Sequence, residues 1–208
     1  MLQTHTVEPV TLSILKRLME MPELKNYYLV GSTALSLKLG HRKTSNLVIY
    51  THEKMDTNVI EKCLKAEFGN DFFIERQNLW FVFLCIVKNI NVEFVYSPHP
   101  PLPTIETIDG IRMHSNKDIA IMKVLSLTFR GEKKHFWDIA ELLKEFSIED
   151  LLQFIEELNL FRKLPTSIPN TLINFEEAEN SPDPVSLKGQ TWVGIKKELQ
   201  AKVREFLS

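Results

Sequence analysis

The spacing of apolar and polar residues separates an N-terminal half that mixes strands with helices from a C-terminal half made of helices. Apolar residues recur at helical spacing over residues 10–21, 33–39 and 57–68, and each stretch predicts a helix. Gly40 is placed to end the second helix, Asp56 to cap the third, and Lys88-Asn89 to form a hairpin turn. Runs rich in β-branched and aromatic residues predict strands over residues 28–30, 47–50, 72–75, 80–87, 92–96 and 105–113.

The C-terminal half carries helix signals at four places. Ser115 with Asp118 and Ser147 with Asp150 fit the capping-box pattern, so helices are expected to begin near residues 116 and 148. Two more helices are expected over residues 134–145 and 192–206. Residues 164–189 hold four of the ten prolines and are expected to form an irregular connection, and the proline-rich segment 97–103 is expected to cross the surface. The pattern predicts an α+β protein, with an α/β domain over residues 1–114 and a helical lobe over residues 115–208.

Composition narrows the class of protein and its partners. The chain has 208 residues and a formal charge of −2, which argues against a globally basic nucleic-acid-binding surface. No apolar run approaches eighteen residues and the first residues do not form a signal peptide, so no membrane partner is expected. Cys63 and Cys85 match no metal-binding spacing and are expected to be buried free thiols. We therefore expect a soluble cytoplasmic protein.

A Gly31-Ser32 pair joins the strand predicted over residues 28–30 to the following helix. Backbone amides at a helix N-terminus carry partial positive charge and favour phosphate. Gly31 would let a phosphate approach the backbone, and the hydroxyl of Ser32 could donate a hydrogen bond. The alternative is a turn that binds nothing.

The helix over residues 119–129 is apolar nearly all round, yet Lys123, Ser126 and Arg130 fall on one face. Because lysine is rarely buried without a partner, we expect this face to line a cleft or reach the surface and to bind an anion. In the alternative, Lys123 extends its amine to the surface and Arg130 pairs with Glu132 or Asp138.

Asp138 has a simple interpretation on the next helix. It follows Lys134 by four residues, and its expected position is the outer face of that helix. An exposed pair with this spacing stabilises a helix by only a few tenths of a kcal/mol.

Two long blocks, LVGSTALSLKLGHRKTSNLVIYT and KDIAIMKVLSLTFRGEKKHFWDIAELLKEFSIEDLLQF, resemble in order and spacing the AbiEii/AbiGii nucleotidyltransferase toxins of abortive-infection systems. The resemblance spans about residues 28–154. It implies the DNA-polymerase-β-like nucleotidyltransferase fold, a mixed sheet flanked by helices with a helical lobe. It also implies Mg²⁺ as cofactor, a nucleoside triphosphate substrate, an antitoxin counterpart and, in some relatives, tRNA as acceptor.

Carried over from this family, the nucleotide-binding residues fall at five positions. Gly31 and Ser32 match the triphosphate turn, and Arg42 matches the basic residue before the metal-binding strand. Lys123 and Arg130 match the basic residues of the helical lobe, where the lysine also belongs to the catalytic set.

The acidic positions of the family are only partly filled in this chain. Asn46 stands where the first metal-binding aspartate belongs, and Val48 stands where the second belongs. Glu93 lies near the third carboxylate and is the candidate metal ligand. In the Asp-x-x-Asp element of the helical lobe, His135 replaces the first acid while Asp138 remains. The resemblance implies catalytic roles for Asn46, Glu93 and Asp138.

These replacements leave three functions open. Two-metal phosphoryl transfer needs carboxylates that hold both ions, so the first is a degenerate member that binds a nucleotide or an RNA end with little or no transfer and weak Mg²⁺ binding. The second is an active transferase that modifies tRNA through a non-standard metal site. The third is a non-catalytic protein-interaction module.

Overall fold

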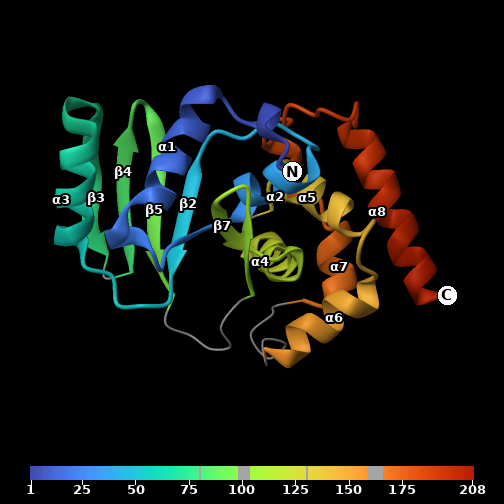
Figure 1. The fold of residues 1–208 in the computed structure, drawn as a ribbon. Coiled ribbons are helices and arrows are strands. Elements are labelled where there is room, and N and C mark those ends of the chain that lie inside the picture. Colours follow the sequence, from blue (N-terminus) through green and yellow to red (C-terminus); the bar gives the residue numbers. More distant parts are fainter. Residues whose placement is uncertain (80, 98–103, 130, 159–165) are drawn as a thin grey trace. The chain divides into compact units, whose positions relative to one another are not determined.

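The computed structural model describes residues 1–79, 81–97, 104–129, 131–158 and 166–208 (Figure 1). Its contacts divide the chain into two compact units. The first, which we call the sheet unit, comprises Met1–Gly40 and Thr44–Ser115. The second, the helical unit, comprises Asn116–Ser208 together with the three residues His41–Lys43.

The sheet unit contains a seven-stranded sheet in the order β3-β4-β5-β2-β1-β7-β6. β1 pairs antiparallel with β2 and parallel with β7, and β2 pairs parallel with β5, so the sheet is mixed as predicted. Its strands are β1 (Tyr28–Val30), β2 (Leu47–Thr51), β3 (Phe72–Leu79), β4 (Val82–Val87), β5 (Ile90–Tyr96), β6 (Ile105–Ile108) and β7 (Ile111–His114). Its helices are α1 (Pro9–Glu20), α2 (Gly31–Leu39) and α3 (Thr57–Phe68), with short 3₁₀ helices at Thr4–Thr6, Pro22–Leu24 and Gly69–Asp71.

One face of this sheet is buried and the other is partly exposed. Along β2, Leu47 and Ile49 are buried while Val48 and Tyr50 are half-buried, the alternation of a strand covered on one side. On the buried face, Ile49 lies beside Phe94 of β5 in the sheet register. α1 contacts β7 and α3 contacts β3, and both helices lie alongside the sheet in Figure 1.

The local signals for helix ends and turns in this unit are confirmed. Gly40 follows α2 in the left-handed conformation with φ 68°, which glycine adopts without steric cost. The side chain of Asp56 accepts hydrogen bonds from the amides at the start of α3. Lys88 and Asn89 form the β4–β5 turn, both with positive φ. Cys85 is buried as expected, but Cys63 is only partly buried, so that expectation is wrong for Cys63.

The single strand predicted over residues 105–113 is wrong. The structure has two antiparallel strands there, β6 and β7, joined at Asp109-Gly110. Both turn residues have positive φ, 51° and 79°, which fits an Asp-Gly pair at the tip of a tight hairpin. The apolar and β-branched composition of both strands concealed the break.

The helical unit packs its helices around aromatic side chains. The ring of Trp137 stacks on Trp192 with centroids 5.8 Å apart, and Phe136 contacts both Trp192 and Phe175. The helices are α4 (Asn116–Phe129), α5 (Lys133–Leu142), α6 (Ile148–Glu157), α7 (Ile168–Ile173) and α8 (Trp192–Leu207), with a 3₁₀ helix at Glu177–Asn180.

Helix boundaries in this unit agree with the sequence pattern at two places and differ at two. The capping box of Ser147 with Asp150 is present at the start of α6, and α8 begins at Trp192. α5 ends at Leu142, three residues earlier than expected. The expected irregular connection over 164–189 contains α7, whose Pro169 lies in its first turn, where a missing amide hydrogen breaks no helical bond. Most of segment 97–103 lies outside the described residues.

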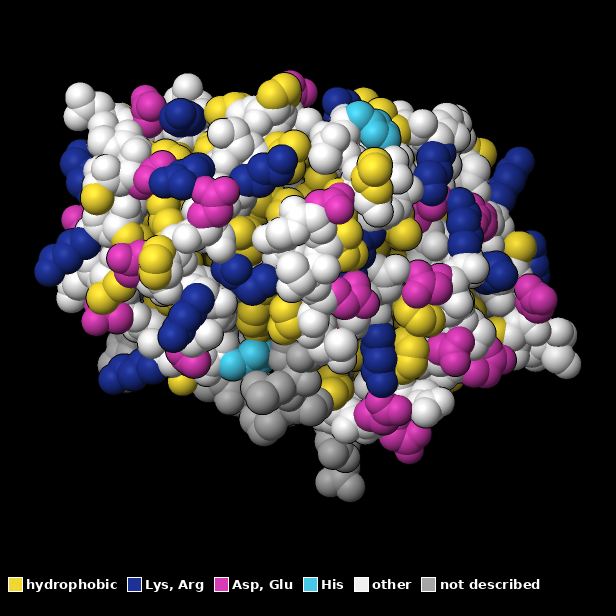
Figure 2. Space-filling view, in the orientation of Figure 1, with side chains coloured by type: hydrophobic (Ala, Val, Ile, Leu, Met, Phe, Trp, Pro, Cys, Tyr) yellow, Lys and Arg dark blue, Asp and Glu magenta, His cyan; other side chains and the backbone are white. Residues whose placement is uncertain are grey.

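The surface charges are mixed. On the face displayed in Figure 2, Lys and Arg side chains are interspersed with Asp and Glu and do not gather into one large basic surface. Phosphate recognition on this face would therefore depend on a local site. Within the part of the chain that the structure describes, no helix is long and apolar enough to cross a membrane.

Candidate functional site

The predicted phosphate turn is a sharp strand-to-helix junction. β1 ends at Val30 and α2 begins at Gly31 with no intervening loop. Gly31 has φ 69°, and a Cβ built on it would meet no atom within 4 Å. The backbone conformation, rather than a lack of space, therefore favours glycine at this position. Gly31 and Ser32 are both partly exposed, so an anion can approach this helix N-terminus from solvent.

The same junction lies beside β2, the strand at which the resemblance places the metal-binding positions. In the antiparallel β1–β2 pair, Val30 is opposite Val48. The hydroxyl of Thr33, in the first turn of α2, donates a hydrogen bond of 2.5 Å to the carbonyl oxygen of Asn46. The phosphate turn and the start of β2 are thus joined by the sheet register and by a side-chain contact.

β2 and β5 bring the three candidate acidic positions together. Val48 is the register partner of Glu93 in the parallel β2–β5 pair, so both side chains leave the sheet on the same face. Asn46, Val48 and Glu93 line one hollow of about 170 Å³. The prediction that these residues border a common cleft is confirmed.

Burial changes the acid–base behaviour of this hollow. It raises the pKa of Glu93, because the ionised carboxylate is less well hydrated there than in water. The pKa of Tyr50, two residues after Val48 on the same face, is also raised, first by burial and then by the nearby charge of Glu93. A cation close to Glu93 would relieve the cost of its negative charge.

A second carboxylate, which the sequence pattern did not single out, lines the same hollow. Glu75 of β3 belongs to the lining together with Asn91. The β3–β4 register shifts between Ile74 and Arg76, so Glu75 lies at an irregularity in the strand. Period-two alternation cannot reveal such a shift, so the sequence pattern did not indicate that Glu75 lines this hollow.

The donor set at this hollow does not match a two-metal centre. Such a centre needs carboxylates that bridge two divalent ions, whereas Asn46 offers a neutral carbonyl oxygen and Val48 offers no donor. Among the described residues, no group of three or more His, Cys, Asp and Glu side chains is placed to hold a metal ion.

In the helical unit, Asp138 is the centre of a buried charge cluster. Its Oδ1 accepts hydrogen bonds from His41 Nε2 at 2.8 Å and Arg42 Nε at 2.7 Å. Its Oδ2 accepts from Arg42 Nη2 at 2.9 Å and forms an ion pair with Lys123 Nζ at 2.7 Å. Asp138 and His41 are fully buried, and Arg42 and Lys123 are nearly so. Burial alone would raise the pKa of Asp138, but the charges of Lys123 and Arg42 hold it well below its ordinary value.

Two expectations from the sequence are wrong at this cluster. Asp138 does not lie on the outer face of its helix as a partner of Lys134, because its side chain is fully buried. Lys123 does not reach the surface, because Asp138 neutralises it inside the protein. Burial lowers the pKa of Lys123, and the negative charge of Asp138 opposes that shift.

Three further residues of the helical lobe were singled out from the sequence, Ser126, Arg130 and His135. Ser126 donates its hydroxyl hydrogen bond to the carbonyl of Met122 in its own helix. Burial, followed by the charge of Lys123, lowers the pKa of His135 to about 4, so its ring is neutral at pH 7. Arg130 lies outside the described residues.

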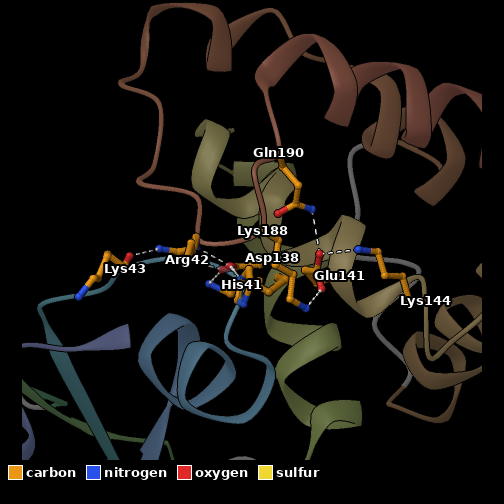
Figure 3. A network of polar contacts seen from close by, with 9 residues as sticks. His41, Arg42, Lys43, Asp138, Glu141, Lys144, Lys188 and Gln190 are labelled. Carbon is orange, nitrogen blue, oxygen red and sulfur yellow. Dashed lines mark hydrogen bonds and ion pairs between the residues drawn. The ribbon is translucent and has the colours of Figure 1, made fainter. Parts of the chain in front are cut away.

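A second buried carboxylate follows Asp138 by one helical turn on α5. Glu141 accepts hydrogen bonds from Lys144 and from both Lys188 and Gln190 of the segment that precedes α8 (Figure 3). The two acids of α5 therefore hold two different stretches of chain, one through Asp138 and the other through Glu141.

Comparison with known proteins identifies the family and the fold. The family model described as nucleotidyl transferase AbiEii toxin, type IV toxin–antitoxin system, matches residues 13–206. The uncharacterized protein aq_aa25 of Aquifex aeolicus (strain VF5) is 25% identical over 202 residues, covering 93% of this chain and 94% of that protein. JHP933 from Helicobacter pylori has a TM-score of 0.61 at 19% identity over 96% of this chain and 92% of its own. The nucleotidyltransferase toxin MenT4 of Mycobacterium tuberculosis H37Rv has a TM-score of 0.58 at 10% identity, over 92% of this chain and 82% of its own. The structural likenesses confirm the predicted nucleotidyltransferase fold, and the family match shows that the chain belongs to the AbiEii nucleotidyl transferase toxin family.

Proposed function

We propose that this protein is a degenerate AbiEii-type nucleotidyltransferase that binds a nucleoside triphosphate or an RNA end with little or no transfer. The observation that carries the proposal is the register of the sheet. Val48 stands directly beside Glu93, where a second carboxylate would be needed to hold a bridging cation. With a neutral amide at Asn46 as well, the site lacks the charge that offsets dehydration of Mg²⁺, so Mg²⁺ binding is weak.

In this proposal the Gly31–Ser32 turn still binds phosphate. Gly31 and Ser32 are partly exposed residues at the start of α2, where the helix dipole favours negative charge. Because the Thr33–Asn46 hydrogen bond places this turn next to β2, a phosphate bound there would lie near the hollow of Asn46 and Glu93.

The family description also supplies an expected counterpart. It names toxins of a type IV toxin–antitoxin system. We extend this to the present chain and expect a cognate antitoxin to counteract whatever activity or binding it has in the cell.

An active transferase that modifies tRNA through a non-standard metal site is the second candidate. The observation in its favour is that Glu75 and Glu93 both line the hollow. Two carboxylates could hold one cation there. Nucleotide binding that requires Mg²⁺ would favour this candidate over the first, and the absence of nucleotide binding would favour an interaction module.

Nucleotide binding should be independent of metal and should depend on Gly31. In titrations of fluorescent ATP and GTP, the unmodified protein should bind at least one of them equally with Mg²⁺ and with EDTA. Gly31→Ala should weaken binding about tenfold or more, because hydrogen bonds to charged groups contribute about 1.5–3 kcal/mol each and relief of the strained positive φ of alanine shifts the amides that donate them.

A matched control separates this effect from simple backbone strain. Gly110, in the β6–β7 turn, also has positive φ and open space around its Cα. Alanine at either glycine should cost about 1–2 kcal/mol of stability because of the left-handed conformation. Only the change at Gly31 should alter nucleotide affinity; equal affinities for the Gly31→Ala and Gly110→Ala proteins would contradict the assignment of the phosphate turn.

A further inference from the structure

Three residues between α2 and β2 belong to the helical unit by their contacts. These residues, His41–Lys43, are flanked on both sides by the sheet unit, which contains Gly40 and Thr44. We call them the strap. Because the strap is the covalent connection from the helix of the phosphate turn to the strand of the metal-binding positions, its anchoring bears on the proposed nucleotide site.

Side chains fix the strap to α5. Arg42 places two nitrogen atoms, Nε and Nη2, on the two oxygens of Asp138, a fork-like geometry that defines the orientation of both groups. His41 Nε2 adds a third hydrogen bond to the same carboxylate. Figure 3 shows the side chains of His41 and Arg42 converging on Asp138.

The backbone of the strap is fixed as well. Arg42 forms an isolated antiparallel bridge with Ser186. Its hydrogen bonds run from the Lys43 amide to the Val185 carbonyl and from the Leu187 amide to the His41 carbonyl, both 2.9 Å long. The strap is therefore held on two sides, by α5 and by the segment before α8.

The chain on either side of the strap leads directly to the proposed nucleotide site. α2 runs from Gly31 to Leu39, two residues before the strap, and β2 begins four residues after the strap. The hydrogen bond from the Thr33 hydroxyl to the Asn46 carbonyl closes this stretch into a loop. The strap lies within this closed loop. A displacement of the strap would therefore be transmitted to the phosphate turn and to the start of β2, where the loop closes.

The carboxylate of Asp138 has no capacity left for a ligand. A carboxylate offers about four lone-pair positions. Oδ1 accepts two hydrogen bonds. Oδ2 accepts one hydrogen bond from Arg42 and forms an ion pair with Lys123. The group is also fully buried. A nucleotide or a metal ion would have to displace one of these cations to reach it.

We propose that Asp138 is a positioning residue that acts through the strap: it fixes the placement of the Gly31–Ser32 turn relative to Asn46 and does not touch the nucleotide. The inference rests on the proposed nucleotide-binding function for its effect on affinity. Its structural part, the order of the two site segments, can be measured in the protein without any ligand.

Backbone amide NMR and ATP titration of the same variants test this inference. Arg42→Lys keeps the positive charge but cannot form the fork, and Asp138→Asn combined with Lys123→Met removes the anion together with one of its cations. Both should shift the ligand-free amide resonances of residues 31–33 and 46–48. Both should also weaken ATP binding about fivefold or more, the usual scale of coupling between linked sites.

Glu179→Gln is the matched control. It removes a helical-unit carboxylate that accepts hydrogen bonds from Trp192 and Lys196, and neither of these belongs to the strap. Its amide resonances at 31–33 and 46–48 and its ATP affinity should equal those of the unmodified protein. If the double variant does not fold, Arg42→Lys decides the outcome.

Two results would overturn the inference. One is unchanged ligand-free resonances at 31–33 and 46–48 in the folded Arg42 and Asp138 variants. The other is weaker ATP binding without those changes, which would mean direct contact with the nucleotide. If the unmodified protein binds neither ATP nor GTP, the proposed function fails on that count, while the ligand-free resonances still decide whether Asp138 positions these segments.

Discussion

Asp138→Asn is expected to lower the free energy of unfolding by about 3–5 kcal/mol, the usual cost of breaking a buried ion pair from one side. The substitution preserves the size of the side chain but removes the only negative charge that the described contacts place against Arg42 and Lys123. Both cations are almost completely buried, so water cannot replace the lost partner. Urea unfolding at pH 7 measures the difference.

Two comparisons isolate the charge. Glu157→Gln breaks an ion pair with Lys117 in which both side chains are exposed, and it should leave stability nearly unchanged. Adding Lys123→Met to Asp138→Asn should recover part of the loss, since one buried cation then disappears with the anion. If Asp138→Asn lowers the free energy of unfolding no more than Glu157→Gln does, the buried charge cluster does not contribute the expected stability.

The pH dependence of the Asp138→Asn effect has a defined sign. The native pKa of Asp138 lies well below that of an unfolded aspartate, which is about 3.9. The stabilising contribution of the carboxylate is therefore fully present above that value and is lost as the pH falls toward the native pKa. The stability difference between the unmodified protein and Asp138→Asn should be constant near neutral pH and should narrow in acid.

Restoring the two missing acids is expected to create a Mg²⁺ site. In the double variant Asn46→Asp with Val48→Asp, Mg²⁺ affinity should rise by about an order of magnitude or more, because affinity follows the number of charged oxygen ligands. The sheet register places a carboxylate at 48 directly beside Glu93, and position 46 lines the same hollow. Calorimetric titration with Mg²⁺ measures the change, and some transferase activity should return if the phosphate turn binds substrate.

The first turn of α3 provides a control with the same chemistry. Asn58 and Val59 are exposed there, outside the hollow. Asn58→Asp with Val59→Asp adds the same two charges to the same protein. Equal Mg²⁺ affinities in the two double variants would show that the hollow binds a cation no better than the exposed first turn of α3 does.

The strands could be predicted from the sequence because they depend on short-range patterns. Composition marks residues 47–50 and 92–96 as strands, whereas the grouping of Asn46, Val48 and Glu93 came from the resemblance of two sequence blocks to the AbiEii family. The parallel β2–β5 register of the structure makes Val48 and Glu93 neighbours. Glu75 could not be assigned in this way, because a register shift in β3 decides its position and leaves no mark in the periodicity.

The charge cluster could not be predicted, because it joins distant parts of the chain. Arg42 and Asp138 are 96 residues apart, and no local pattern links them. Local reasoning paired Asp138 with Lys134 across one helical turn, which is a weak interaction. Burial favoured the distant pairing, since a carboxylate inside the helical unit needs strong partners and Lys123 and Arg42 supply them.

The most direct measurement is incorporation of a labelled nucleotide by the unmodified protein in the presence of Mg²⁺, with tRNA and protein as acceptors. In this account the rate stays at the level of a reaction without protein, because Asn46 and Val48 cannot hold the ions that stabilise the reacting phosphate. Brisk Mg²⁺-dependent incorporation, abolished by Glu93→Ala, would contradict it. That result would mean that Glu93 and other groups hold the metal without carboxylates at positions 46 and 48.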